Sequence, residues 1–315
     1  APDAQMEDSA MIQAKPVNAL LKARYRREMG WSILFVAPAI LGFLLFVITP
    51  LARTVFMSLT NWSGYSDQWD FVGVSNYAQV LGQPRFYRAI GRSLIFMAYH
   101  IVLGAGGGLI IAFLISQARW FQNLFRVLLF FPRVLALSVV GITWTQLCHP
   151  IIGLFNTTLE AIGLGALTTA WLGDTATALP MVSIASAWNA YGFYMVIFLS
   201  AMQSIDPSLY EAARIDGASK RQQFVHVTIP GLYNTISTVL VMGFIAGIKG
   251  FGTVWSMTQG GPVDATELAM VYIWRGAFQN NQMPYALAGS IVFGLVIMGV
   301  SVAMNQLRER KDIDA

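Results

Sequence analysis

Two basic residues, Arg133 and Lys249, stand inside long apolar stretches of the sequence. An ionisable side chain within a membrane-spanning segment is costly, so it usually faces a cavity or a partner and marks a functional site. The planar fork of arginine matches the geometry of a carboxylate or a phosphate. We therefore take Arg133 and Lys249 as candidate contacts for an anionic ligand. The alternative for Arg133 is that it reaches the cytoplasmic headgroups or pairs with an acidic residue of a neighbouring subunit.

A polar stretch between two apolar runs is a second candidate, here for docking a partner. Asp206-Pro207 is typical of a helix start, because aspartate accepts orphan N–H bonds at the cap and proline suits the first helical position. Gly217 suits the left-handed position just after a helix end. These residues predict a short helix over 207–216. Its surface offers carboxylates beside small alanines, which a partner can approach closely: Glu211, Ala212, Ala213 and Asp216.

The same stretch predicts a second short helix. Ser219 is a suitable N-cap, and the helix it starts is expected to run towards Pro230, where the next apolar run begins. The alternative for the whole stretch is an ordinary solvated loop without a partner.

The composition places these candidates in a membrane. Of the 315 residues, 56% are hydrophobic and 11% are charged, whereas an average soluble domain has roughly 25% charged residues. Six uncharged runs exceed the roughly 20 residues that cross a bilayer core. We expect an all-α integral membrane protein with transmembrane helices at about 31–56, 92–116, 126–147, 179–203, 231–256 and 284–306.

Charge placement predicts the orientation. With both termini in the cytoplasm, the outside carries four basic residues, Arg85, Arg88, Arg92 and Arg275. The inside then carries thirteen: Lys15, Lys22, Arg24, Arg26, Arg27, Arg119, Arg126, Arg214, Lys220, Arg221, Arg308, Arg310 and Lys311. The positive-inside rule favours this topology. The net charge of +4 is therefore a topology signal, and without a basic stripe of interleaved aromatics it does not indicate a nucleic-acid partner.

We expect one membrane domain over 31–306, with cytoplasmic tails at 1–30 and 307–315 and a cytoplasmic loop at about 204–230. No cleavable signal peptide is expected. The aromatic-rich segment 58–91 is interpreted as an interfacial belt, with a ligand platform as the alternative. The glycine run from Gly104 to Gly108 favours close helix–helix approach over a phosphate loop, because it lies within an apolar span.

The polar loop resembles the signature of permease subunits in binding-protein-dependent ABC importers. The motif is Glu-Ala-Ala, three residues, glycine, and a later hydrophobic-x-hydrophobic-Pro ending. Here it is Glu211-Ala212-Ala213, Gly217 and Val227-Thr228-Ile229-Pro230. Other segments resemble the sugar-importing branch, of the maltose and glycerol-phosphate type: Phe131-Pro132, Trp188, Gln203 to Pro207, Asp216-Gly217-Ala218 and Thr258 to Pro262. The resemblance covers about 31–306.

The resemblance implies a mechanical role. In such importers the loop helix inserts into a cleft of a separate ATPase subunit, and closure of the ATPase dimer turns the spans from inward-open to outward-open. Glu211 would meet basic groups there, while Ala212, Ala213 and Gly217 would allow close seating, with Asp216 and Pro230 completing the coupling motif. The further implied partners are a second permease subunit, a periplasmic or lipid-anchored solute-binding protein, a saccharide substrate and membrane lipid. The chain itself would be non-catalytic and without cofactor or metal, and the partner ATPase would bind ATP and Mg.

The resemblance also implies a transport cavity near mid-membrane. It would be lined by Arg133, Leu137, Ser186, Asn189, Ala190, Phe193, Ala246, Gly247 and Gly250, with Lys249 as a weaker candidate. The chain departs from the maltose type in having an arginine at 133 and small residues at 246, 247 and 250. We interpret these departures as a roomier, positively charged cavity, suited to uronate oligosaccharides, as in an alginate importer, or to glycerol phosphates.

Two other classes are weighed against the importer permease. A stand-alone secondary transporter often has inverted repeats and broken helices, and neither is visible in the sequence. An integral-membrane enzyme would need a nucleophile–base set, and none can be assembled from residues inside the spans. The three histidines, His100, His149 and His226, lack the spacing of metal ligands.

Overall fold

The computed structural model describes residue 29 and residues 32–65, 68–117 and 122–313. Contacts between Cα atoms divide the chain into two compact units, Ala1–Met57 and Ser58–Ala315. The predicted N-terminal tail lies outside the described residues except for Met29, and the predicted domain boundaries stay predictions. Within the described ranges the elements are helical, and the strand-like pairing there is a single bridge between Thr60 and Phe71. The all-α fold class is confirmed.

The first unit contains one long apolar helix over Ser32–Met57. Its middle is π-helical (η1, Leu44–Ile48) and its last part is α2 (Thr49–Met57). The hydroxyl of Thr49 donates to the carbonyl of Leu44 at 2.9 Å and that of Thr54 to the carbonyl of Pro50 at 2.9 Å. Both threonine hydroxyls thus bond carbonyls of the preceding turn of their own helix, a contact that often accompanies a bend.

In the second unit, the second span is longer than predicted. A short helix, α3 (Ser75–Leu81), is followed by α4 (Pro84–Tyr99), the π-helix η2 (His100–Gly106) and α5 (Gly107–Gln117). The last three segments form one helix over Pro84–Gln117. It starts at Pro84 because Gln83 is extended and proline suits the first turn. The aromatic-rich segment 58–91, which was expected to precede this span, therefore already contains its first turns.

The third span is not one helix, contrary to prediction. It consists of α6 (Gln122–Val134) and α7 (Leu137–Leu147), which are bent by 96° relative to one another. The fifth is also interrupted, between α13 (Tyr233–Ile248) and α14 (Gly252–Met257). Broken helices, which are not visible in the sequence, are therefore present in the described chain. Sequence hydropathy did not reveal the breaks because one charged residue, Arg133 or Lys249, leaves the average over a long apolar run high.

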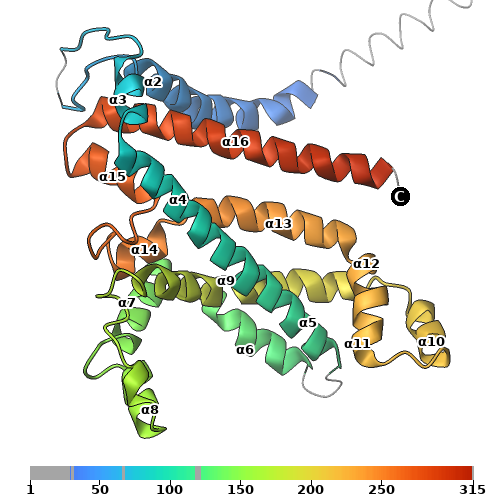
Figure 1. Cartoon of the computed structure of the whole chain (residues 1–315). Helices are drawn as coiled ribbons and strands as arrows, with labels where there is room; N and C mark the ends of the chain where they lie inside the picture. Colours follow the sequence, from blue (N-terminus) through green and yellow to red (C-terminus); the bar gives the residue numbers. More distant parts are fainter. Residues whose placement is uncertain (1–28, 30–31, 66–67, 118–121, 314–315) are drawn as a thin grey trace, which may run out of the picture. The chain divides into compact units, whose positions relative to one another are not determined.

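The fourth span, α9 (Ala178–Met202), lies at the centre of the second unit. It is the most buried of the candidate spans, with 61% of its apolar window buried. Figure 1 shows it running between α13 and α6. The glycine run packs on it as predicted: a Cβ added to Gly108 would lie 2.9 Å from backbone atoms of Tyr191 and Met195. Small residues thus allow η2 and α5 to approach α9 closely.

The remaining elements complete the two ends of the second unit. After α7 come α8 (Leu154–Ala161) and the 3₁₀ turn η3 (Gly165–Leu167). The loop after α9 contains α10 (Pro207–Ile215), α11 (Lys220–Gln223), the π-helix η4 (Phe224–Thr228) and α12 (Ile229–Gly231). The chain ends with α15 (Ala269–Phe278) and α16 (Met283–Ile313), so the sixth helix continues beyond the predicted residue 306.

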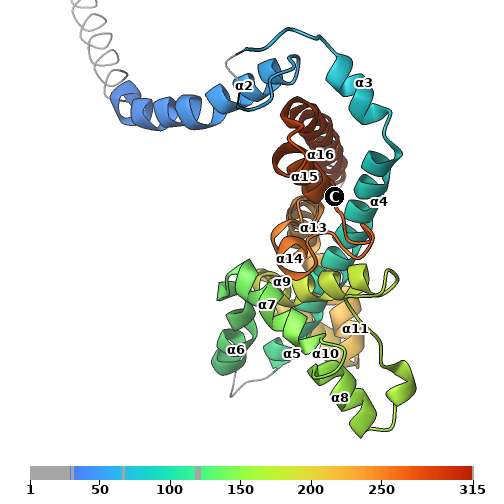
Figure 2. The ribbon, with the colours of Figure 1, turned by 90° about the vertical axis from the view of Figure 1, so that its left-hand side faces the viewer.

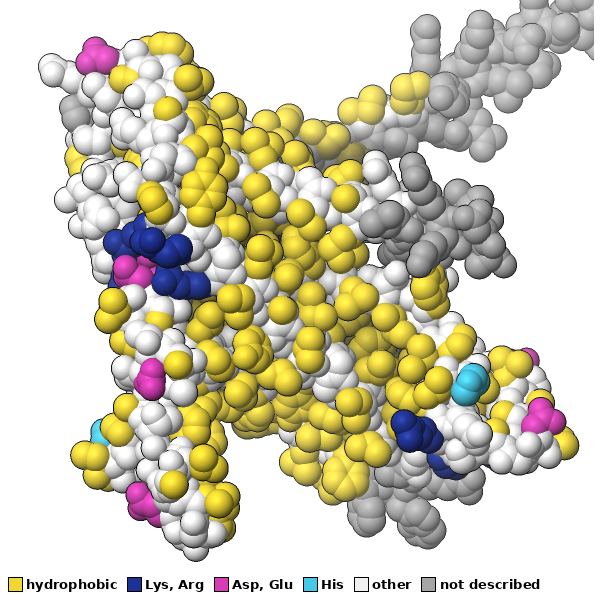
Figure 3. All heavy atoms as spheres, viewed as in Figure 1, with side chains coloured by type: hydrophobic (Ala, Val, Ile, Leu, Met, Phe, Trp, Pro, Cys, Tyr) yellow, Lys and Arg dark blue, Asp and Glu magenta, His cyan; other side chains and the backbone are white. Residues whose placement is uncertain are grey.

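The six predicted spans are recovered when the bent pair α6–α7 counts as one. Five helices of the described chain are long and apolar enough to cross a membrane, and the bent pair makes the sixth. Figure 1 places α10 and α11 at the end of the second unit opposite α3, α14 and α15, and Figure 2 shows the unit from the latter end. We call the latter the outer end, following the predicted orientation. On the face of the second unit in Figure 3, apolar side chains cover the middle and charged ones gather towards the ends.

Candidate functional site

The helix predicted from Asp206-Pro207 forms as α10. The Asp206 carboxylate accepts a hydrogen bond from the backbone N–H of Ser208 at 2.9 Å, and Pro207 occupies the first turn. This hydrogen bond lowers the pKa of Asp206. At the other end Gly217 has φ +74°, and Ala218 N–H donates to the carbonyl of Ala213 at 2.9 Å. A left-handed residue with such a bond closes the helix, as the sequence predicts.

The second half of the loop is held against α10. Ser219 and Gln222 form a reciprocal capping box that starts α11. The Tyr210 hydroxyl, on α10, bonds the Thr228 hydroxyl at 3.0 Å, and the buried Gln223 donates to the carbonyl of Ala218 at 2.9 Å. A cavity of about 640 Å³ lies between α10, α11 and the ends of α5 and α9. The loop is therefore an ordered unit of two helices held together by side-chain hydrogen bonds. An ordinary solvated loop would not need these contacts.

The residues of the coupling motif lie on the surface of this unit. Glu211, Ala212, Asp216, Gly217 and Pro230 are exposed, and Ala213 is half-buried. Beside them Ile215 is 86% exposed and Leu209 52% exposed. An apolar side chain that is this exposed outside the spans is suited to burial in a partner. Most residues of the motif are thus accessible from outside this unit, and the partner that would bind them stays a prediction.

At the break of the third span, Asn189 bridges two helices. Its Nδ2 donates to the carbonyl of Pro132 at 2.6 Å, and its Oδ1 accepts from Nη1 of Arg133 at 3.4 Å. In a continuous helix the carbonyl of Pro132 would accept from the N–H of residue 136. Here Ala136 is extended as the N-cap of α7, and the backbone supplies only a long bond of 3.4 Å from the N–H of Leu135. The hydrogen bond from Asn189, on α9, thus replaces the backbone bond that the break removes from the carbonyl of Pro132.

Arg133 lies at the C-terminal end of α6, beside the break. Its guanidinium carbon is 5.2 Å from the centre of the Phe193 ring, and the side chain is exposed in the second unit. The negative end of the helix dipole and the aromatic face both stabilise a cation there. Close packing supports this arrangement, because a Cβ on Gly192 would lie 2.3 Å from the carbonyl of Leu129. Three predicted cavity residues, Arg133, Asn189 and Phe193, are therefore brought together.

Lys249 lies at the break of the fifth span. It is the C-cap of α13 and is exposed, as is Ala246 one turn earlier. The two breaks are neighbours: a Cβ on Gly252 would lie 2.7 Å from Cδ1 of Leu137, the first residue of α7. Non-helical backbone at membrane depth is tolerated where it is buried in protein or lines a cavity. Arg133, at the end of α6, and Lys249, at the end of α13, thus lie at two neighbouring breaks.

The small residues at 247 and 250 do not enlarge a cavity as we interpreted them from sequence. A Cβ on Gly247 would lie 2.9 Å from Cα of Met97, and one on Gly250 would lie 2.3 Å from Cε1 of Phe96. Both glycines therefore allow α4 to pack on the α13–α14 region. Their place in the substrate cavity remains a prediction, as does that of Ala190, which is buried.

The structure adds one residue that the sequence reasoning missed. His100, the first residue of η2, is 6% exposed, and its ring nitrogens bond the Ser186 hydroxyl at 3.3 Å and the Tyr194 hydroxyl at 3.1 Å. Ser186 is thereby fixed on the same face of α9 as Asn189 and Phe193. A signal was available, because His100 is an ionisable residue inside a predicted span.

From sequence the histidines were considered only as metal ligands. In the described ranges no cluster with three or more His, Cys, Asp or Glu residues suits a metal. The contacts of His100 instead join η2 to the Ser186 hydroxyl on α9.

Comparisons with known proteins agree with this architecture. The chain is 35% identical over 271 residues to the "Probable ABC transporter permease protein YurN" of Bacillus subtilis, covering 85% of this chain and 92% of the relative. It is 32% identical over 287 residues to the "Multiple sugar-binding transport system permease protein MsmF" of Streptococcus mutans, covering 90% and 96%. Among solved structures, a bacterial ABC transporter involved in the import of the acidic polysaccharide alginate has a similar fold. Its TM-score is 0.78 at 22% identity, covering 92% of this chain and 98% of that one.

The family assignment rests on a match that spans most of the second unit. Residues 104–312 match the family described as "Binding-protein-dependent transport system inner membrane component". The match includes the α6–α7 break, the two-helix loop and α13 to α16. The chain therefore belongs to the family of inner membrane components of binding-protein-dependent transport systems.

Proposed function

We propose that this chain is a permease subunit of an ATP-driven importer that carries an oligosaccharide across the bacterial inner membrane by alternating access. The family supports transport, and MsmF is named for multiple sugars. The observation that carries the proposal is the coupling motif, folded as an exposed and doubly capped α10. The proposal includes a second permease subunit and an ATPase dimer that binds ATP and Mg. This chain supplies no catalytic group.

The substrate proposed is an acidic saccharide. Its support is the position of two exposed basic residues, Arg133 and Lys249, each beside the break of its span. The two breaks are neighbours, because Leu137 and Gly252 lie against each other. A guanidinium that is held by Asn189 and Phe193 still has donors left for a carboxylate. The alginate importer of similar fold is a further, weaker support, because its likeness to this chain concerns the fold.

A stand-alone secondary transporter is the second candidate. Such transporters bind substrates at discontinuous helices. The broken third and fifth spans do not favour them over an importer, however, because a bacterial ABC transporter has a similar fold. The two candidates differ in their partners. Only the importer requires an ATPase and a second six-span chain that purify with it.

The test is ATPase activity of the purified, reconstituted complex. We expect stimulation by a solute-binding protein loaded with acidic oligosaccharides, and less by neutral ones of equal length. A chain that purifies without an ATPase and transports sugar in response to an ion gradient would overturn the importer. Equal stimulation by neutral and acidic sugars would overturn the substrate class alone.

A further inference from the structure

Four aromatic side chains at the outer end form a continuous series of ring contacts, which we call the aromatic row. Phe251 and Trp255 are stacked, with 5.5 Å between ring centres and 10° between ring planes. The ring of Trp255 lies 4.1 Å from that of Trp274, and Trp274 lies 5.5 Å from Phe278. The row therefore runs from the break of the fifth span, across α14, to the end of α15.

The spacing of these residues in the sequence explains the row. Phe251 and Trp255 are four positions apart at the start of α14, and the N–H of Trp255 donates to the carbonyl of Phe251 at 2.8 Å. Trp274 and Phe278 are likewise four apart on α15. Residues at this spacing share one face of a helix. Each helix thus contributes one pair of rings, and the two pairs meet at the two tryptophans.

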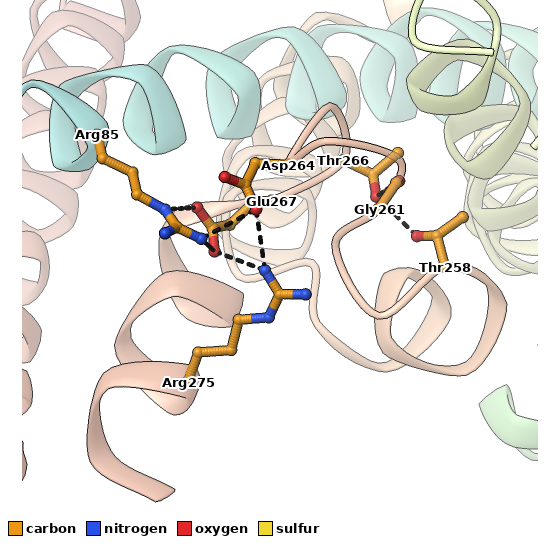
Figure 4. Close-up of polar contacts among 7 residues, drawn as sticks. All are labelled: Arg85, Thr258, Gly261, Asp264, Thr266, Glu267 and Arg275. Atoms are coloured by element: carbon orange, nitrogen blue, oxygen red, sulfur yellow. Dashed lines mark hydrogen bonds and ion pairs between the residues drawn. The ribbon is translucent and has the colours of Figure 1, made fainter. Parts of the chain in front are cut away.

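A charged network holds the α15 half of the row in place (Figure 4). Glu267, which is fully buried, accepts from Nε of Arg85 on α4 at 2.7 Å and from Nη1 of Arg275 on α15 at 3.0 Å. Asp264 accepts from both arginines, at 2.9 and 3.1 Å, so two carboxylates balance two guanidiniums. Because Arg275 directly follows Trp274, this network fixes the helix turn that presents the second tryptophan.

The loop between the two helices is tied at its base by hydroxyl groups. The hydroxyl of Thr258, the C-cap of α14, bonds that of Thr266 at 2.7 Å, and Thr266 donates to the carbonyl of Gly261 at 2.7 Å (Figure 4). The α14 and α15 pairs are therefore held in register with one another. A ligand that binds to rings already in place avoids the cost of ordering them.

The rings of the row retain contact with their surroundings outside the second unit. Phe278 is 57% exposed, and the other three are half-buried. Trp171, a packing tryptophan nearer α8, donates from Nε1 to Asn156 at 2.8 Å. Neither Trp255 nor Trp274 makes such a hydrogen bond within the described residues. The row thus offers apolar ring faces together with two indole N–H donors.

This combination matches the chemistry of a saccharide. A pyranose ring has C–H groups on a face that can bury against an aromatic ring, and hydroxyls at its edge that accept hydrogen bonds. Tryptophan supplies both an apolar face and a donor. An interfacial belt of aromatics would stay at the depth of the headgroups. Phe251 instead lies inside the candidate span Tyr233–Met257, two residues after Lys249, whereas Phe278 lies outside the candidate spans of the described chain.

We propose that the aromatic row is a stacking track for the sugar rings of an oligosaccharide, leading from the outer end to the break at Lys249. This inference rests on the proposed function, because it concerns the same substrate. Stacking depends on the ring faces and not on charge, so the row adds a preference for chain length that is separate from the acid preference assigned to Arg133. A longer saccharide covers more rings and buries more apolar surface.

The test measures uptake into vesicles that contain the reconstituted importer complex and its solute-binding protein, with a disaccharide and a tetrasaccharide of the same sugar. Trp274→Leu is expected to lower kcat/KM for the tetrasaccharide by about tenfold, the order of a lost aromatic contact, and to change that for the disaccharide far less. Trp274→Tyr, which keeps an aromatic face, should retain most of the tetrasaccharide uptake. Co-purification of the ATPase with each variant verifies assembly.

Phe278→Leu has a matched control in Phe71→Leu. Both phenylalanines are exposed, at 57% and 66%, and Phe71 belongs to the outer segment 58–91 but not to the row. Only Phe278→Leu should reduce tetrasaccharide uptake more than disaccharide uptake.

Three outcomes would overturn the track. An equal fall in the uptake of both saccharides by Trp274→Leu would show that the ring only supports the fold. Equal effects of Phe278→Leu and Phe71→Leu would assign the rings to the bilayer interface. Unchanged tetrasaccharide uptake in Trp274→Leu would leave the row without a role in transport. The proposed function fails separately, by a wild-type complex that takes up neither saccharide or that purifies without an ATPase.

Discussion

Asn189 donates a hydrogen bond of 2.6 Å to the carbonyl oxygen of Pro132, across the interface of the third and fourth spans. This bond takes a backbone acceptor that a continuous helix would use, just before the chain turns by 96°. Asn189 was predicted as a substrate contact. In the structure its amide bonds Pro132 through Nδ2 and Arg133 through Oδ1, and its contact with a substrate stays a prediction.

We expect Asn189→Leu to destabilise the assembled complex. It leaves the carbonyl of Pro132 with only the long bond from the N–H of Leu135, and a buried acceptor that loses its partner costs about 1–3 kcal/mol. Asn189→Asp should have a similar effect through loss of the Nδ2 donor, while its carboxylate still accepts from Arg133. Thermal unfolding of the purified complex measures both. Asn234→Leu, at the exposed start of α13, is the control, and an equal fall in Tm there would contradict the prediction.

Gly217 has φ +74° and lies in open space, with no atom within 4 Å of an added Cβ. Its substitution therefore tests backbone conformation alone. Gly217→Val should uncouple ATP hydrolysis from transport by displacing the end of α10, while Gly217→Asn retains coupling, because asparagine tolerates the left-handed region. Transport per ATP hydrolysed is the measurement. Gly163→Val is the matched control: φ +81° and equally open space, but far from α10 in sequence and after α8. Uncoupling by Gly163→Val as well would refute the assignment.

Arg133 is expected to select acidic substrates. Arg133→Gln should raise the KM for an acidic oligosaccharide by about tenfold, the order of one lost charge-assisted contact, and leave a neutral one unchanged. Arg133→Lys should fall between, because an ammonium cannot form the planar fork. Uptake into vesicles measures both substrates, and Arg88→Gln, exposed on α4, controls for surface charge. Intact acidic-sugar uptake in Arg133→Gln would show that Arg133 binds lipid or a neighbouring subunit instead.

His100 is predicted to hold Ser186 in place. His100→Leu removes both of its hydrogen bonds and should raise KM with little change in kcat, because substrate binding loses an ordered hydroxyl. His100→Gln should restore part of the affinity, and Tyr194→Phe, which removes one of the two bonds, should have a smaller effect. Transport kinetics measure the changes in KM and kcat separately. A fall in kcat without any change in KM would indicate a merely structural histidine.

Much of the fold was accessible from sequence because membrane helices are specified locally. Long apolar runs predicted the spans, since every backbone group must be satisfied within the segment. The caps of α10 were predicted from Asp206, Pro207 and Gly217, because capping depends on residues only a few positions apart. The glycine run at 104–108 likewise predicted close packing, although the sequence did not indicate α9 as its partner.

The breaks and the site were decided by tertiary structure. Pro132 alone is compatible with a kinked helix; the turn of 96° needs Asn189, 57 residues later, to satisfy the freed carbonyl. The roles of Gly247 and Gly250 depended on α4 lying against them. The buried Glu267 is satisfied by Arg275 on α15 and by Arg85, which is 182 residues earlier. The chemistry of each residue and its near neighbours in the sequence decides which groups need a hydrogen-bond partner or a counter-charge. Which distant group supplies the partner depends on packing, because the interaction energies act over a few ångströms in space and not along the chain.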